Sequence, residues 1–118
     1  MAISTTVNRI TAGDLFTFTV TPKDENGATY DVSVGTWLCT VGVYDSNGTE
    51  LLRKNHDSLT GDNTGFITHL TTTETAALPV TTGNTYHVLA AQCVRSDTTP
   101  AISIERAAFL DVDTQYIT

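Results

Sequence analysis

Two short acidic segments, Asp24–Gly27 (DENG) and Asp45–Gly48 (DSNG), have the composition of a cation-binding loop. An EF-hand loop ends on a glutamate at its twelfth position, which binds calcium through both carboxylate oxygens. Counted from the first aspartate of each segment, the twelfth residue is Gly35 in one case and His56 in the other, so the EF-hand pattern fails. Asn-Gly between alternating runs is instead typical of hairpins, because both residues tolerate a positive φ. The sequence therefore predicts two turns, with an irregular calcium site between loops as the alternative.

Three histidines and two cysteines are the other candidates for metal binding or nucleophilic chemistry. His56, His69 and His87 do not stand at the spacing of paired metal ligands, so each is predicted to be a surface or edge residue. Cys39 and Cys93 lie in the apolar runs TWLCTV and LAAQCVR, which predicts two small buried side chains. Two cysteines are too few for a disulfide framework, but a bridge between them stays open if their strands are neighbours.

No catalytic arrangement is visible in the sequence. His87 and Cys93 could share one face of a strand, but they would stand roughly 20 Å apart along it, too far for a Cys–His pair. The chain has no Gly-x-Ser-x-Gly elbow, no phosphate-binding glycine loop and no clustered pair of carboxylates. The sequence therefore predicts a protein that is not an enzyme and that uses no metal or cofactor.

The length and charge of the chain restrict its partners. It has 118 residues, as expected for a single domain over 1–118, and a net charge of −7. Such an acidic chain repels nucleic-acid phosphates and anionic lipid headgroups, so we expect neither nucleic acid nor membrane as a direct partner. There is no run of 18 apolar residues, and the start MAISTTVNRI lacks the basic-then-apolar layout of a signal peptide. We therefore expect no secretory export.

Apolar and polar residues alternate with the period of β-strands over most of the chain. Phe16, Phe18 and Val20 would share one face of a strand, with Thr17 and Thr19 on the other. Segments of this kind are separated by turn residues, and the predicted strands are 3–10, 15–21, 32–44, 49–54, 66–71, 85–95 and 101–112. This spacing of short strands predicts an all-β sandwich.

One segment departs from the alternation. Thr71 and Glu74 have the spacing of a capping box, the residues that follow favour one or two helical turns, and Pro79 ends them. The sequence therefore predicts one short helix between the strands at 66–71 and 85–95.

Two aromatic residues refine the fold class. Trp37, the single tryptophan, takes the place of the buried aromatic in an immunoglobulin-like sandwich. Tyr86 stands where a conserved tyrosine of that fold bonds back to the preceding corner. The prediction is an immunoglobulin-like β-sandwich of about seven strands, without the cysteine pair of antibody domains.

Three segments of the chain, taken in order, form a recognisable pattern. They are GDLFTFTVTPKDENGATYDVS, VGVYDSNGTELLRK and LTGDNTGFITHLTTTETAALPVTTGNTYHVLAAQ. Their order of an apolar–threonine strand, two Asp-x-Asn-Gly turns and a Thr-Ala-x-Leu-Pro segment resembles the immunoglobulin-like modules of tailed-bacteriophage virion proteins. It is similar in particular to the N-terminal module of phage baseplate upper proteins, over roughly residues 11–94, with a longer spacing from Pro79 to Gly83. Because that family usually carries the module within a longer chain, a free-standing head or tail accessory protein is also compatible with the resemblance.

The second face of two central strands is a candidate contact surface. If Trp37 and Tyr86 point into the sandwich, the residues that alternate with them point outward. An apolar, small-residue face toward solvent is typical of a protein–protein contact, and the C-terminal tail could cover it or reach a neighbour. The predicted interface residues are Leu38, Gly42, Tyr44, Leu89, Ala91, Cys93, Tyr116 and Ile117. The alternatives are a bulge that shifts the phase of the strand at 85–95, or cover by a terminal segment.

These observations and the resemblance imply a non-enzymatic bacteriophage virion structural protein. It would be a head-decoration or tail/baseplate accessory protein, located in the virion, that docks onto other virion proteins in several copies or as a homo-oligomer. The alternative is a host-surface glycan-binding or adhesion module that uses loops at one end of the sandwich. Glycan sites favour exposed aromatic residues, whereas these loops are mostly Thr, Asn, Asp and Gly, apart from Tyr30 and Phe66 near their edges.

Overall fold

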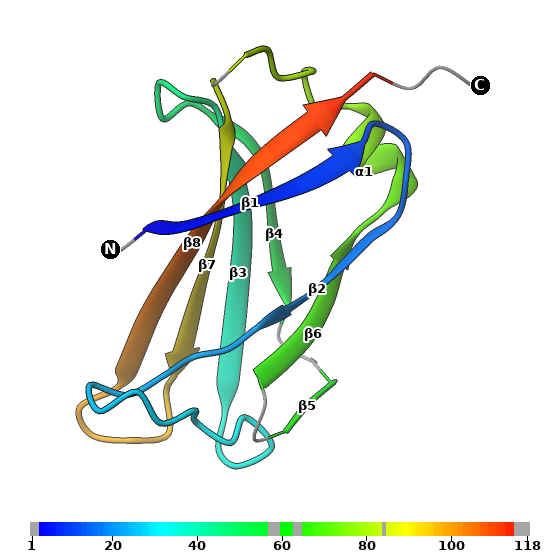
Figure 1. Ribbon diagram of the computed structural model, residues 1–118. Coiled ribbons are helices and arrows are strands. Elements are labelled where there is room, and N and C mark those ends of the chain that lie inside the picture. The colour runs from blue at the N-terminus through cyan, green and yellow to red at the C-terminus, as the bar shows by residue number, and fades with distance from the viewer. Residues whose placement is uncertain (1–2, 57–59, 63–64, 84, 115–118) are drawn as a thin grey trace.

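The computed structural model describes residues 3–56, 60–62, 65–83 and 85–114, and they form two β-sheets packed face to face (Figure 1). The elements are β1 (Ile3–Thr11), β2 (Phe16–Val20), β3 (Trp37–Tyr44), β4 (Glu50–His56), β5 (Thr60–Asp62), β6 (Gly65–Leu70), α1 (Thr72–Ala76), β7 (His87–Arg95) and β8 (Ile102–Asp113). One sheet has the order β1-β8-β7-β3-β4 and the other β2-β6-β5. The first and last strands pair in parallel, and the other strand pairs are antiparallel. This is the predicted immunoglobulin-like sandwich.

The third strand is shorter than the sequence suggests. Its predicted start at residue 32 is wrong, because a tight turn precedes Trp37. The Asp31 carboxylate accepts a hydrogen bond from the Ser33 N–H (3.0 Å), and the Val34 N–H bonds to the Asp31 carbonyl (3.2 Å). An aspartate that bonds to the backbone two residues ahead stabilises a turn in place of a strand. The short strand β5 was not predicted, because three residues carry too little alternation to be recognised.

The predicted helix is confirmed as α1, between β6 and β7. Its capping box is complete: the Thr71 N–H donates to Glu74 Oε1 (2.8 Å) and the Glu74 N–H donates to Thr71 Oγ1 (3.2 Å). Thr75 is buried, its hydroxyl donates to the Asp14 carbonyl (2.7 Å), and it accepts from the Gly13 N–H (3.0 Å). These bonds attach the helix to the connection between β1 and β2.

The two acidic segments form the same turn. In each, the aspartate Oδ1 accepts two backbone N–H bonds of 2.9 to 3.0 Å, from Asn26 and Ala28 in one turn and from Asn47 and Thr49 in the other. The glycine has φ +83° in both, whereas no residue other than glycine has a positive φ in the described part of the chain. The carboxylates therefore shape the backbone. No group of three or more His, Cys, Asp or Glu side chains placed to hold a metal ion occurs among the described residues.

The core lies between the two sheets and is apolar. Trp37 is buried as predicted, its ring is 6.1 Å from that of Phe66 and 5.6 Å from that of Tyr30, and its Nε1–H donates to the Val34 carbonyl (2.9 Å). The buried core residues are Ile10, Val20, Val32, Trp37, Cys39, Val41, Val43, Phe66, Leu70, Leu78, Leu89, Ala91, Cys93, Leu110 and Val112. Among the described residues, no helix is long and apolar enough to cross a membrane.

Candidate functional site

The pairing of β3 with β7 determines which residues of β7 face the core. Leu89 pairs with Val43, Ala91 with Val41 and Cys93 with Cys39. Directly paired residues share one face of a sheet, and the three β3 partners are between 0% and 1% exposed. Leu89, Ala91 and Cys93 accordingly lie in the core, with exposures of 7%, 6% and 0%. The prediction that these three residues face solvent is wrong.

The position of Tyr86 explains why the prediction exchanged the two faces of β7. The sequence-based expectation placed Tyr86 inside the sandwich, but it is only half-buried and its ring packs 5.8 Å from that of Phe109. Phe109 pairs with Val88, whose neighbour Leu89 is in the core, so Tyr86 and Phe109 lie on the outer side of the sheet. The buried residue at the start of β7 is His87, whose Nε2–H donates to the Pro79 carbonyl (2.7 Å).

The histidine predictions have mixed outcomes. His87 is not the surface residue that was predicted, because it occupies the first core-facing position of β7. His69 is exposed, as predicted. The side chain of His56 lies outside the described residues.

The outward direction predicted for the β3 residues is confirmed. Leu38 is 39% exposed and Tyr44 is half-buried. A Cβ atom at Gly42 would lie 2.8 Å from Cε2 of the Tyr44 ring, so this ring lies directly over the Gly42 backbone. Their role in an interface stays a prediction, and Tyr116 and Ile117 lie outside the described residues.

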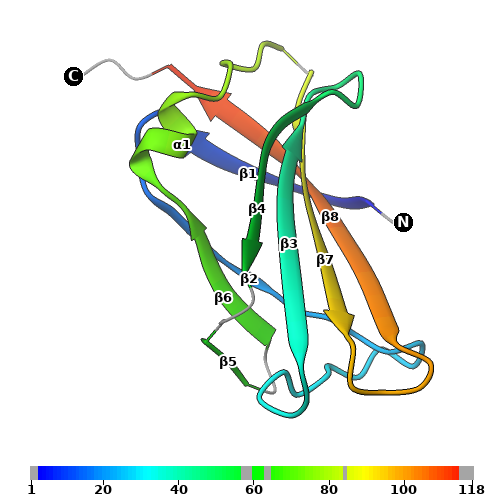
Figure 2. The same cartoon turned by 180° about the vertical axis from the view of Figure 1, so that it is seen from behind.

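The residues that pair with Gly42 and Tyr44 on neighbouring strands extend an apolar surface on the outer side of the five-stranded sheet. Gly42 pairs with Ala90, Tyr44 with Val88, and Val88 with Phe109. We call the following residues the outer-face patch: Gly42, Tyr44, Tyr86, Val88, Ala90 and Phe109. Figure 2 shows β4, β3, β7 and β8 side by side, with β2 passing behind them.

Charged pairs flank this patch on two sides. Arg53 on β4 lies 3.6 Å from Glu50, and Arg9 on β1 lies 3.2 Å from Asp111 on β8. An apolar, aromatic centre with a charged rim is the usual anatomy of a protein interface. Tyr86, Val88 and Ala90 were not predicted as patch residues because the two faces of the strand at 85–95 were exchanged, and Phe109 on β8 was not singled out from the sequence.

Two carboxylates with lowered pKa values lie outside the patch and link elements of the fold. Burial disfavours the charged form of Glu74, but hydrogen bonds from Lys54 Nζ (2.6 Å) and the Thr71 N–H (2.8 Å) outweigh this and lower its pKa. Bonds from Arg95 Nε (2.9 Å) and the Thr36 N–H (3.0 Å) lower the pKa of Asp97 to about 2. Glu74 therefore links α1 to β4, and Asp97 links the end of β7 to the residue that precedes β3.

The two cysteines are a directly paired, fully buried couple of free thiols on neighbouring strands. Contact with Cys39 and burial raise the pKa of the Cys93 thiol, so that this thiol is protonated at neutral pH.

Because both thiols are fully buried and a reagent reaches them only when the chain opens, we expect the native chain to react with a thiol reagent such as DTNB about a thousandfold more slowly than the chain in guanidinium. Titration of two thiols after unfolding and none before would bear this out. One thiol that reacts rapidly in the native chain would contradict it.

No protein-family model, curated protein or solved structure matches this chain. The resemblance to phage virion modules therefore stays a prediction. The outer-face patch is the structural feature on which we base the proposed function.

Proposed function

We propose that this chain is a non-enzymatic structural protein of a bacteriophage virion, which docks onto another virion protein through the outer-face patch. The patch supports this proposal because it presents two tyrosine rings, a phenylalanine ring and small apolar side chains, all half-buried, between two charged pairs. Tyrosine is enriched among the residues that contribute most to protein interfaces. The resemblance to phage modules supplies the virion assignment, and a head or a tail position is compatible with it.

The position of the patch on paired strands also suits a protein partner. Strand pairing holds Gly42, Ala90 and Val88 in one rigid sheet, and the Tyr44 ring lies across Gly42. A rigid surface loses little conformational entropy when it binds, which favours affinity. A glycan-binding module would instead concentrate aromatic residues in loops at one end of the sandwich, where this chain has mostly turn residues.

A charge at the centre of the patch is expected to abolish docking. Val88→Glu places a carboxylate between Tyr44 and Phe109, where the partner would have to remove it from water. We expect the number of copies of this chain per major capsid protein, measured by quantitative mass spectrometry of purified particles, to fall about tenfold or more. The control is Ile67→Glu, which makes the same kind of change at a side chain 54% exposed on the other sheet.

Two results would contradict this proposal. The wild-type chain could be absent from particles, which would remove the virion assignment. Alternatively, Val88→Glu and Ile67→Glu could be incorporated equally well, in which case the outer-face patch is not the docking surface.

A further inference from the structure

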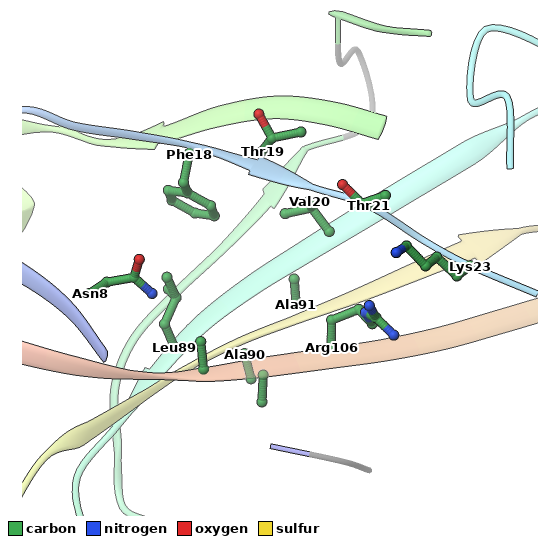
Figure 3. Close-up of a pocket in the computed structure, with 12 residues that line it drawn as sticks. Asn8, Phe18, Thr19, Val20, Thr21, Lys23, Leu89, Ala90, Ala91 and Arg106 are labelled. Carbon is green, nitrogen blue, oxygen red and sulfur yellow. The ribbon is translucent and has the colours of Figure 1, made fainter. Parts of the chain in front are cut away.

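A groove with a volume of about 360 Å³ opens between the two sheets, below β2 and beside β8 (Figure 3). Its wall on the β2 side is formed by Phe18, Thr19, Val20, Thr21 and Lys23. Its floor and far side are formed by Asn8, Leu89, Ala90, Ala91, Arg106, Ala107 and Ala108. The floor is rich in alanine, so the two sheets leave space where larger side chains would meet. The groove is separate from the outer-face patch, except for Ala90.

The groove has two chemically different ends. Figure 3 shows Phe18 and Leu89 toward one end, and the Lys23 ammonium and Arg106 guanidinium groups together toward the other. Arg106 pairs with the buried Ala91, so it lies on the core-facing side of β8, at the mouth of the groove.

Lys23 and Arg106 are exceptional among the cations of this chain. The chain has six Lys and Arg residues against 13 Asp and Glu residues. The other four cations each contact a carboxylate, in the pairs Arg9–Asp111, Arg53–Glu50, Lys54–Glu74 and Arg95–Asp97. Within the described residues, Lys23 and Arg106 have no such partner, although both line the same groove. Two unpaired positive charges on an acidic protein make a local site that favours an anionic group.

The strand edges beside the groove are open. β1 pairs with β8 from Ala107 to Asp113, so no other described strand pairs with that edge of Ile102–Arg106. β2 is the end strand of its sheet, so one of its edges is open too. A free strand edge presents backbone N–H and C=O groups that an incoming extended segment can use.

We propose that this groove binds an extended acidic peptide segment of a partner protein. The segment adds as a strand to the Ile102–Arg106 edge of β8, in line with β1. Alternate side chains of such a strand point under β2, so that a carboxylate opposite Arg106 reaches Lys23 and Arg106. The charge complementarity selects an acidic segment, and the open edge selects an extended backbone. This proposal holds whether or not the chain belongs to a virion.

A designed peptide pair can test this proposal on the whole chain. The probe is acetyl-Ser-Thr-Val-Thr-Glu-Thr-Val-Thr-Ser-amide, which presents a glutamate flanked by two valines on one face in either strand direction. The control peptide carries glutamine in place of the glutamate. Titration followed by two-dimensional amide NMR is expected to shift the signals of Ile102–Arg106 and Thr21–Lys23, with the glutamate peptide binding about tenfold more tightly.

The double variant Lys23→Gln/Arg106→Gln shows whether the two cations cause this preference. We expect the two peptides to bind this variant equally, because the charge-dependent part of the affinity has been removed. Arg53→Gln is the control: it removes one exposed cation outside the groove and is expected to keep the tenfold preference. Thermal unfolding of each variant within a few degrees of the wild type shows that the fold is retained.

Several results would overturn the proposal. These are equal binding of both peptides to the wild type, shifts confined to the outer-face patch, and no shift at millimolar peptide. Groove signals that move with protein concentration alone would assign the groove to a second copy of the chain. A single-stranded DNA oligonucleotide that shifts the groove signals more strongly than the peptide would assign it to nucleic acid.

Discussion

Leu89→Glu is expected to prevent the chain from folding. Leu89 is 7% exposed, pairs with the buried Val43 and packs in the core between the sheets. The substitution removes about 2 kcal/mol of apolar burial and places an unpaired carboxylate in an apolar environment, which costs several kcal/mol more. The total, about 5 kcal/mol or more, is comparable with the whole stability of a domain of this size. Circular dichroism and a guanidinium titration should show no cooperative unfolding transition.

The neighbouring variant Val88→Glu is the matched control for this prediction. It introduces the same side chain one position earlier, on the outer side of the sheet, and is expected to lower the free energy of unfolding by only about 1 kcal/mol. A one-residue change of phase moves a side chain from the core to the surface, so the pair reports directly on the orientation of β7. If Leu89→Glu unfolds cooperatively while Val88→Glu does not fold, the orientation described for β7 is reversed.

The sequence was sufficient for the fold because most strands carry their own signal. Phe16, Phe18 and Val20 alternate with threonines, and β2 forms over those residues. The Thr71–Glu74 capping box and Pro79 define α1 without any tertiary information. The acidic turns were placed correctly because Asp side chains and Gly backbones favour them locally.

The orientation of β7 could not be predicted because both of its faces are apolar. Leu89 and Ala91 alternate with Val88 and Ala90, so periodicity gives two equivalent phases. The choice rested on Tyr86, which precedes the strand and packs on Phe109 of β8. Only the register with β3, a contact between segments far apart in sequence, distinguishes the two phases.

The groove could not be predicted from the sequence either, because it too depends on contacts between segments far apart in the chain. Lys23 follows β2 and Arg106 lies within β8, and nothing in either local pattern links them. They meet because the segment that follows β2 passes in front of β7 and β8, as Figure 1 shows. Among the described residues the other four cations each pair with a carboxylate and Lys23 and Arg106 do not, and only the three-dimensional structure shows this difference.

Gly65→Ala is expected to lower the stability of the fold strongly, although it adds only one methyl group. Gly65 begins β6 with φ +118°, a conformation that residues with a side chain rarely adopt. A Cβ atom there would overlap the Val20 carbonyl oxygen and would lie 3.0 Å from the Thr21 Cα. Both neighbours are backbone atoms, so β2 and β6 would have to move apart. Adding about 1–2 kcal/mol of backbone strain to about 1–3 kcal/mol of overpacking, we expect the free energy of unfolding, measured by guanidinium titration, to fall by about 2–5 kcal/mol.

Gly48→Ala separates the two contributions to this loss. Gly48 also has a positive φ, +83°, but a Cβ atom there would meet nothing within 4 Å. It should therefore show only the backbone strain, about 1 kcal/mol, in the same guanidinium titration. Because Val20 and Thr21 also line the groove, Gly65→Ala should in addition weaken binding of the acidic peptide, whereas Gly48→Ala should not. Equal losses of stability in the two variants would show that the approach of Gly65 to β2 is not tight, and that backbone conformation alone explains the glycine.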